Sequence, residues 1–139
     1  MTAEPSELCQ SCARTHTAAQ GCLSGIVLVC GSRKYRRWVR VKSALDSLAA
    51  RMVVLGVRHG AADGADTWAG SWAQLRNVPE DPMAADWSRG KGAGPIRNQA
   101  MLDKGGVVCV VAFPPGPAGT FDMVQRAEAY RGRFDLAEA

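Results

Sequence analysis

Short apolar runs alternate with amphipathic stretches through most of this sequence, and that alternation constrains the fold more than any other feature. Residues 26–30 (IVLVC) form an uninterrupted apolar run that ends at Gly31. Such a run is typical of a strand buried on both faces of a parallel sheet. The stretch 39–52 then places apolar residues at helical spacing, namely Val41, Leu45, Leu48 and Met52. The sequence therefore begins its core with a strand, a loop and a helix.

The same unit repeats toward the C-terminus. Further strands are predicted at 52–57, 83–85 and 106–113, and further helices at 65–76, 96–103 and 120–131. The second helix carries Trp68, Trp72 and Leu75 on one face, and the tail 133–139 either adds a short edge strand or frays. Strands that alternate with helices imply right-handed crossovers. We therefore expect an α/β protein, a Rossmann-like three-layer sandwich with a mostly parallel sheet.

Length and charge narrow the classes of function. The 139 residues are 47% hydrophobic, which suits one domain with a real core, and the net charge is +4. The positive charge favours anionic partners or serves solubility alone. Residues 107–113 form the longest apolar run, which is too short to cross a bilayer, and no apolar leader segment is seen. We expect a cytoplasmic protein with no membrane partner, and the sequence leaves a homo-oligomer open.

The first 24 residues form an appendage to a domain that spans 25–139. They contain the series C-x2-C-x3-H-x5-C, made by Cys9, Cys12, His16 and Cys22. Three thiolates and an imidazole can complete a tetrahedral zinc site. The set resembles a retroviral zinc knuckle, although that family has gaps of x4 and x4 in the later positions. A redox or iron–sulfur role and idle thiols in a disordered tail are the alternatives, and no cofactor is evident in the core.

Ligands of parallel sheets collect at the carboxyl ends of the strands, so the loops there are the first place to look for a site. The loop after the first strand contains Gly31, Ser32 and Arg33, and this guanidinium suits a two-pronged contact with phosphate. Basic residues continue from Lys34 to Lys42, interleaved with Tyr35 and Trp38. Such a run is either a solvated helix face or a surface that binds single-stranded nucleic acid.

The loop after the second strand, HGAADGAD, offers a second set of candidates. Residues from Gly60 to Gly64 suit an anion-binding nest. Asp63 or Asp66 would accept from a ribose hydroxyl or cap the following helix. His59 would bond a base or a phosphate, or it is a histidine satisfied within the loop.

A glycine-rich stretch, DWSRGKGAGPIRN, contributes three further candidates, Lys91, Arg97 and Asn98. Arg97 and Asn98 begin a helix, where polar side chains have little structural reason to face inward, so we expect them to contact a ligand. Trp87 would stack on a base or fill the core, and the core is the favoured interpretation.

The last of these loops, PPGPAGT, follows the most apolar strand. Its candidates for holding a phosphate are Pro115, Gly116, Gly119 and Thr120, because glycines let the backbone approach a ligand and Thr120 can cap the next helix. A plain turn between strand and helix is the alternative. No Gly-Lys-Ser/Thr triplet of a P-loop is present, which disfavours ATP hydrolysis of that type.

These loops together resemble the SLOG superfamily, specifically its YspA-like, YpsA-related branch. The motifs that carry the resemblance are VLVCGSRKY, HGAADGADTWAGSWA, DWSRGKGAGPIRNQAML and AFPPGPAGTFDMV, which span about residues 26–126. The resemblance implies a Rossmann-like fold and a pocket for nucleotides or nucleotide-derived ligands. Some relatives cleave a nucleotide's base from its ribose phosphate, and others are sensors in defence and signalling. Such proteins occur in bacteria and their phages.

Enzymatic members of that superfamily carry a Pro-Gly-Gly-x-Gly-Thr-x-x-Glu pattern, in which the Glu assists glycosidic cleavage. In this chain Pro117 replaces a glycine and removes an N–H group, and Met123 stands where the pattern has its Glu. Asp122 is the one nearby carboxylate and so the candidate catalytic residue, although a helix would rotate it about 100° away.

Three functions remain open from the sequence. The leading hypothesis is binding of a nucleotide or another ligand with a ribose phosphate, as a sensor or in phage or bacterial defence signalling. The second is a nucleoside 5'-monophosphate phosphoribohydrolase. The third is a nucleic-acid-binding module that joins the zinc segment to the basic run 33–42.

Overall fold

The computed structural model of this chain describes residues 24–113, 118–129 and 135–138. In these ranges the chain alternates strands and helices, as the apolar pattern predicts. The elements are β1 (Ser24–Gly31), α1 (Trp38–Ala49), β2 (Val53–His59), α2 (Ala65–Leu75), β3 (Glu80–Pro82), the 3-10 turn η1 (Trp87–Arg89), α3 (Ala93–Asp103), β4 (Val107–Phe113), α4 (Ala118–Ala129) and β5 (Asp135–Glu138). The five strands form one sheet in the order β3-β2-β1-β4-β5, and every neighbouring pair is parallel. The expected α/β, Rossmann-like fold is confirmed.

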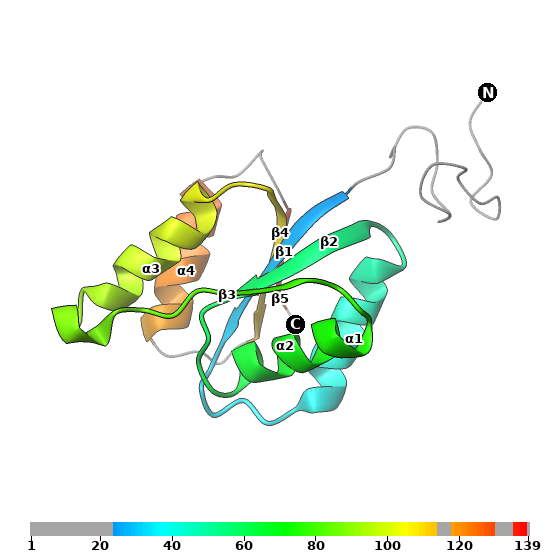
Figure 1. The fold of residues 1–139 in the computed structure, drawn as a ribbon, viewed down its shortest axis with the longest axis horizontal. Coiled ribbons are helices and arrows are strands. Elements are labelled where there is room, and N and C mark those ends of the chain that lie inside the picture. Colours follow the sequence, from blue (N-terminus) through cyan, green and yellow to red (C-terminus); the bar gives the residue numbers. More distant parts are fainter. Residues whose placement is uncertain (1–23, 114–117, 130–134, 139) are drawn as a thin grey trace.

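Helices cover both faces of this sheet. Helices α1 and α2 lie on one face, and α3 and α4 lie on the other (Figure 1). Alternate residues of β1 serve the two layers: Val27 and Val29 pack with α1 and α2, whereas Leu28 and Cys30 pack with α3 and α4. A strand buried on both faces must be apolar throughout, which is why β1 and β4 read as continuous apolar runs.

The order of the strands fixes where a ligand would enter. From β1 the chain moves outward through β2 to β3, and it then returns to place β4 on the other side of β1. The connections from β1 and β4 therefore run to opposite faces of the sheet. Gly31 and Phe113, the last residues of β1 and β4, are paired in the ladder, so the switch point lies between them. Doubly wound sheets bind their ligands in the crevice at such a point.

Strand β2 is longer than the apolar run predicts. It continues through Arg58 and His59, both of them buried, although the sequence assigned them to a loop. Arg58 is satisfied inside the protein: its Nε donates to Asp81 at 2.8 Å, and its Nη1 donates to the carbonyl oxygens of Met101 and Gly105 at 2.6 and 3.0 Å. These partners lie far along the chain, so no local pattern marks the residue as a strand position.

Two further predictions about the elements need correction. Strand β3 is Glu80–Pro82, not 83–85, and it pairs with the last residues of β2 at the edge of the sheet, where a proline is tolerated. Leu75 is 68% exposed at the end of α2, whereas Trp72 on the same helix is buried. The C-terminal segment does add an edge strand, β5, beside β4.

Some predictions lie outside the described residues. The proposed zinc ligands Cys9, Cys12, His16 and Cys22 all precede residue 24, so the structure does not test them. Cys30 and Cys109 are buried, as their apolar surroundings predict. None of the helices in the described ranges is both long and apolar enough to span a bilayer.

Candidate functional site

The loops after β1 and β2 touch each other directly. The backbone N–H of Ala65 donates to the carbonyl oxygen of Ser32 at 3.2 Å. A Cβ on Gly64 would collide with that same oxygen and would lie 2.6 Å from the carbonyl carbon of Arg33. Gly31 is equally restricted, since a Cβ there would lie 2.6 Å from Cβ of Ala65. Small residues therefore allow the two loops to pack at the switch point, as the predicted convergence requires.

Asp66 organises the second loop from the first turn of α2. Its Oδ2 accepts the backbone N–H groups of Gly60 and Ala62 at 3.1 and 3.3 Å. Its Oδ1 is buried and has no hydrogen-bond partner among the described residues, and the residue is only 5% exposed. Burial raises the pKa of Asp66, while the loop amides and the charge of Arg97 work in the opposite direction. One oxygen shapes the loop, and the other is left for a further donor.

His59 is satisfied within the protein. The N–H of Ala61 donates to Nδ1 at 2.9 Å, so Nδ1 carries no proton and the neutral ring has its hydrogen on Nε2. That nitrogen donates to Oε2 of Glu80 at 2.6 Å. This hydrogen bond, with a second from Gln74, lowers the pKa of Glu80. The interpretation of His59 as a satisfied histidine fits its contacts, although the residue belongs to the strand.

The predicted nest from Gly60 to Gly64 is partly filled by the protein itself. The amides of Gly60 and Ala62 donate to Asp66, and the amide of Ala61 donates to His59. Asp63 is exposed and, with Gly64, lies in the part of the loop whose amides donate to neither acceptor. The protein's own acceptors therefore occupy the first half of the predicted nest.

Arg97 connects the second loop to α3. Its Nη1 donates to the carbonyl oxygens of Gly60 and Met83 at 2.6 and 3.3 Å, and its Nε donates to Oδ1 of Asn98 at 3.0 Å. Burial lowers the pKa of Arg97, the charge of Asp66 opposes this, and repulsion from Arg33 adds to the lowering. The hydrogen bonds of Arg97 therefore tie the second loop to the start of α3.

Asn98 is buried, contrary to the expectation that polar residues at this helix start would face outward. Its Nδ2 donates to Oδ2 of Asp122 at 3.0 Å, and the same oxygen accepts from Nε of Arg126 at 2.8 Å. Burial raises the pKa of Asp122, but the hydrogen bonds from Arg126 and Asn98 outweigh it and the pKa is lowered. Asp122 is therefore ionised at neutral pH and has no proton to give. Arg126 was not predicted, although its i,i+4 spacing from Asp122 is a usable signal.

Trp87 does not fill the core. Its side chain is 51% exposed, and the guanidinium carbon of Arg33 lies 5.2 Å from the centre of its ring. The aromatic residues of the basic run behave in the opposite way. Tyr35 is buried against Phe113, with ring centres 5.4 Å apart, and Trp38 packs on Trp68 at 5.6 Å. Both rings therefore pack on other side chains of the protein, with Tyr35 buried and Trp38 partly buried.

The remaining candidates lie in or near the two helices α3 and α4, or outside the described residues. Lys91 is exposed beside α3. Gly119 and Thr120 lie in the first turn of α4, whereas Pro115 and Gly116 fall outside the described residues. Met123, at the position of the catalytic Glu in the enzymatic pattern, is fully buried in the cluster that α4 forms with β1 and β4.

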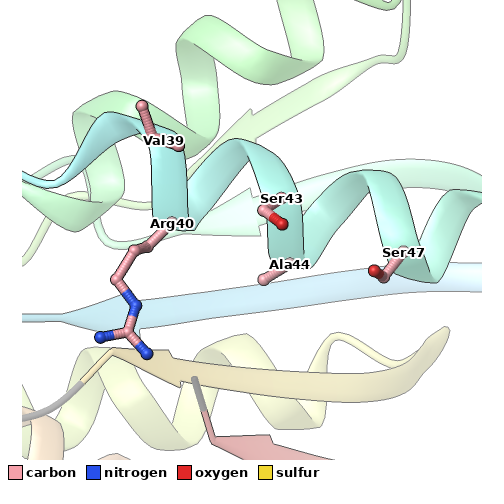
Figure 2. Close-up of a pocket in the computed structure, with 5 residues that line it drawn as sticks. All are labelled: Val39, Arg40, Ser43, Ala44 and Ser47. Carbon is pink, nitrogen blue, oxygen red and sulfur yellow. The ribbon is translucent and has the colours of Figure 1, made fainter.

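A hollow elsewhere on the surface does not belong to this site. It has a volume of about 300 Å³ and is lined by Val39, Arg40, Ser43, Ala44 and Ser47. Figure 2 shows that all five side chains come from α1. None of the residues predicted to hold a ligand lines it.

The fold and the packed loops define a Rossmann-like α/β protein with its candidate site at the switch point of the sheet. The family model described as "YspA, cpYpsA-related SLOG family" matches residues 25–90. The chain is also 39% identical over 110 residues to the Gene 61 protein of Mycobacterium phage D29. This alignment covers 73% of the present chain and 87% of the phage protein. The chain belongs to this SLOG family, as the motifs predict.

Proposed function

We propose that this chain binds a nucleotide or a nucleotide-derived ligand that carries a ribose phosphate, at the carboxyl edge of β1 and β2. The observation that carries the proposal is Arg33, an exposed cation in the loop after β1, whose backbone lies against Gly64 of the second loop. Within the described residues, the side chain of Arg33 makes no hydrogen bond or ion pair, and its guanidinium lies over the ring of Trp87. An anion at this edge of the sheet would accept charge-assisted hydrogen bonds from Arg33.

The buried oxygen of Asp66 supports the sugar half of the ligand. Oδ1 lacks a donor among the described residues, and a buried acceptor without a donor costs about 1–3 kcal/mol. A ribose hydroxyl would supply that donor, while Oδ2 keeps its bonds to the loop. The phosphate would lie toward Arg33 and the exposed half of the loop, near Asp63 and Gly64.

The proposed role is binding without hydrolysis, as in a sensor of phage or bacterial defence signalling. Met123 is apolar and buried where the enzymatic pattern has its Glu. Asp122 is engaged by Asn98 and Arg126, and its lowered pKa leaves it without a proton for a leaving base. Incubation with nucleoside 5'-monophosphates should therefore release no free base. Steady release that Asp122→Asn abolishes would favour the phosphoribohydrolase instead.

The binding experiment compares melting temperatures with and without ligand for the wild type and two arginine variants. The probes are the four common nucleoside 5'-monophosphates, ADP-ribose and ribose 5-phosphate. A ligand at 100 times its Kd stabilises a protein by about 2.7 kcal/mol, which gives a clear shift. Arg33→Ala should lose the shift. Arg51→Ala, which removes the same charge beyond the end of α1, should keep it.

Two results would contradict the proposal. One is the absence of a shift with every phosphate-bearing probe at millimolar concentration. The other is an equal loss of the shift in both arginine variants, since that would reflect net charge and not a site.

Nucleic-acid binding is the second candidate, and one observation favours it. Four exposed cations follow β1 in a short stretch and form no ion pair within the described residues: Lys34, Arg36, Arg37 and Arg40. Binding to phosphates by such a cluster should weaken linearly with the logarithm of salt concentration. The double change Arg36→Ala and Arg37→Ala should reduce the slope by about two phosphate contacts. An affinity for DNA or RNA that ignores salt would exclude this function.

A further inference from the structure

The four tryptophans of this chain have different surroundings, and Trp87 stands apart. Trp72 is buried, and Trp38 and Trp68 are partly buried and pack on each other. Trp87 is 51% exposed in the short turn η1, next to the candidate site. Because about half of its indole surface stays in water, Trp87 contributes less hydrophobic stabilisation to the fold than the other three tryptophans do.

The ring is nevertheless held in place. The turn that carries it is capped by Asp86, whose side chain accepts from the backbone N–H of Ser88 at 3.2 Å. On α3, a Cβ at Gly94 would lie 3.2 Å from the edge of the indole, so the glycine lets the ring edge pack close to that helix. The edge of the indole is therefore supported, while much of its surface stays accessible.

Arg33 shows that a flat group can reach the face of this ring. Its guanidinium carbon lies 5.2 Å from the ring centre, within the range of a cation–π contact. Arg33 comes from the loop after β1, and Trp87 comes from the segment that leads into α3. The contact therefore places an aromatic surface within one side-chain length of the cation assigned above to the phosphate.

We propose that Trp87 is the stacking surface for the base of the bound nucleotide, an inference that rests on the function proposed above. The base would stack on the indole, the phosphate would pair with Arg33, and the ribose between them would reach Oδ1 of Asp66. Every base has a π face, so stacking selects for the presence of a base and not for its identity. Trp87 thus sets the preference for nucleotides over sugar phosphates.

The test measures, by calorimetric titration, the affinity of the full chain for AMP and for ribose 5-phosphate, which differ by the base alone. In Trp87→Ala the affinity for AMP should fall by about 5- to 150-fold, the range expected for a stacked base, while that for ribose 5-phosphate stays unchanged. Trp87→Phe keeps an aromatic face and should lose less. Ile96→Ala, which truncates another exposed apolar side chain on α3, is the matched control and should behave as the wild type.

The outcomes separate this inference from the proposed function. Wild-type protein that binds AMP no more tightly than ribose 5-phosphate overturns the inference alone. An unchanged AMP affinity in Trp87→Ala does the same, as does an equal loss for both ligands, since that would mean a structural role. Protein that binds neither probe, nor any other of the nucleotides named above, overturns the proposed function and the inference with it.

Fluorescence gives a second readout. Stacking of a base should quench the emission of the exposed indole, and the quenching should vanish in Trp87→Phe, in which the three more buried tryptophans remain. Quenching that persists in this variant assigns the base to another part of the protein and overturns the inference.

Discussion

Replacing Gly64 with alanine tests the packing of the two loops that form the candidate site. Gly64 has φ +77° and ψ −126°, a conformation that side-chain-bearing residues rarely adopt. An added Cβ would also collide with the carbonyl oxygen of Ser32 and lie 2.6 Å from the carbonyl carbon of Arg33. Both of these are backbone atoms, so the collision cannot be relieved by turning a side chain. The substitution therefore combines backbone strain with overpacking.

The chain contains two glycines that separate these effects. Gly90 has φ +88°, but a Cβ there meets nothing within 4 Å, so Gly90→Ala should cost the strain alone, about 1–3 kcal/mol. Gly92 has φ −70° and equally open space, so Gly92→Ala should be neutral or stabilise by up to about 1 kcal/mol, because alanine restricts the unfolded chain. Gly64→Ala adds about 1–3 kcal/mol of overpacking to the strain, which gives about 2–6 kcal/mol in all.

The measurement is urea unfolding of the three variants and the wild type, with the slope m checked for constancy so that midpoints compare stabilities. The expected order of stability is Gly92→Ala highest, then Gly90→Ala, then Gly64→Ala. A Gly64 variant as stable as the Gly90 variant would refute the direct contact between the loops after β1 and β2. The described arrangement of the site would fall with it.

Four other expectations can be checked with standard assays. Arg58→Ala leaves the carbonyl oxygens of Met101 and Gly105 without their donor, and each such loss costs about 1–3 kcal/mol. A loss below about 1 kcal/mol in urea unfolding would argue against the strand position of Arg58. Because its pKa is lowered in the folded protein, ionised Glu80 stabilises the fold above its ordinary pKa of 4.5, and this stabilisation is lost as the pH falls through the lowered value. Glu80→Gln should therefore weaken the pH dependence of the melting temperature below about pH 5. The raised pKa of Asp66 acts in the opposite sense. Its contribution to the stability of the fold is present below its ordinary pKa of 3.8 and is lost as the pH rises through the raised, folded-state pKa, so the melting temperature should decline over this range. Asp66→Asn should remove this decline in melting temperature. Purified protein under reducing conditions should contain one zinc per chain and Cys12→Ser should contain none, whereas wild-type protein without zinc would sink the zinc prediction.

The fold could be predicted from the sequence where burial is a local property. Strands β1 and β4 are enclosed on both faces, so residues 26–30 and 107–113 are apolar throughout and each run marks its strand. The helices follow from apolar spacing in the same way. Strand β3 could not be found from the sequence, because none of its three residues, Glu80–Pro82, is a buried apolar residue that would mark a strand. Its position is fixed only by pairing with β2, which is a contact between distant segments.

The convergence of the loops was also predictable, because parallel strands bring their carboxyl ends to one edge of the sheet. The partners of individual side chains were not. Arg97 was expected to contact a ligand, and for His59 and Asp66 both a ligand contact and a structural role were open. All three make hydrogen bonds that hold the second loop in shape. Such bonds join residues that lie up to 37 positions apart in the sequence. A loop motif predicts that polar groups gather, but it cannot tell which of them bind one another.

This distinction decides how mutations at the site should be interpreted. Removing Arg97 would leave the carbonyl oxygen of Gly60 without its donor and the buried charge of Asp66 without a neighbouring cation. Loss of ligand binding in such a variant would follow from a collapsed loop as readily as from a lost contact. Arg33 is exposed and holds no other residue by a hydrogen bond within the described ranges, so its removal leaves the loops intact. The ligand's position is therefore best determined from Arg33 and Trp87, and the buried network is best treated as the support that presents them.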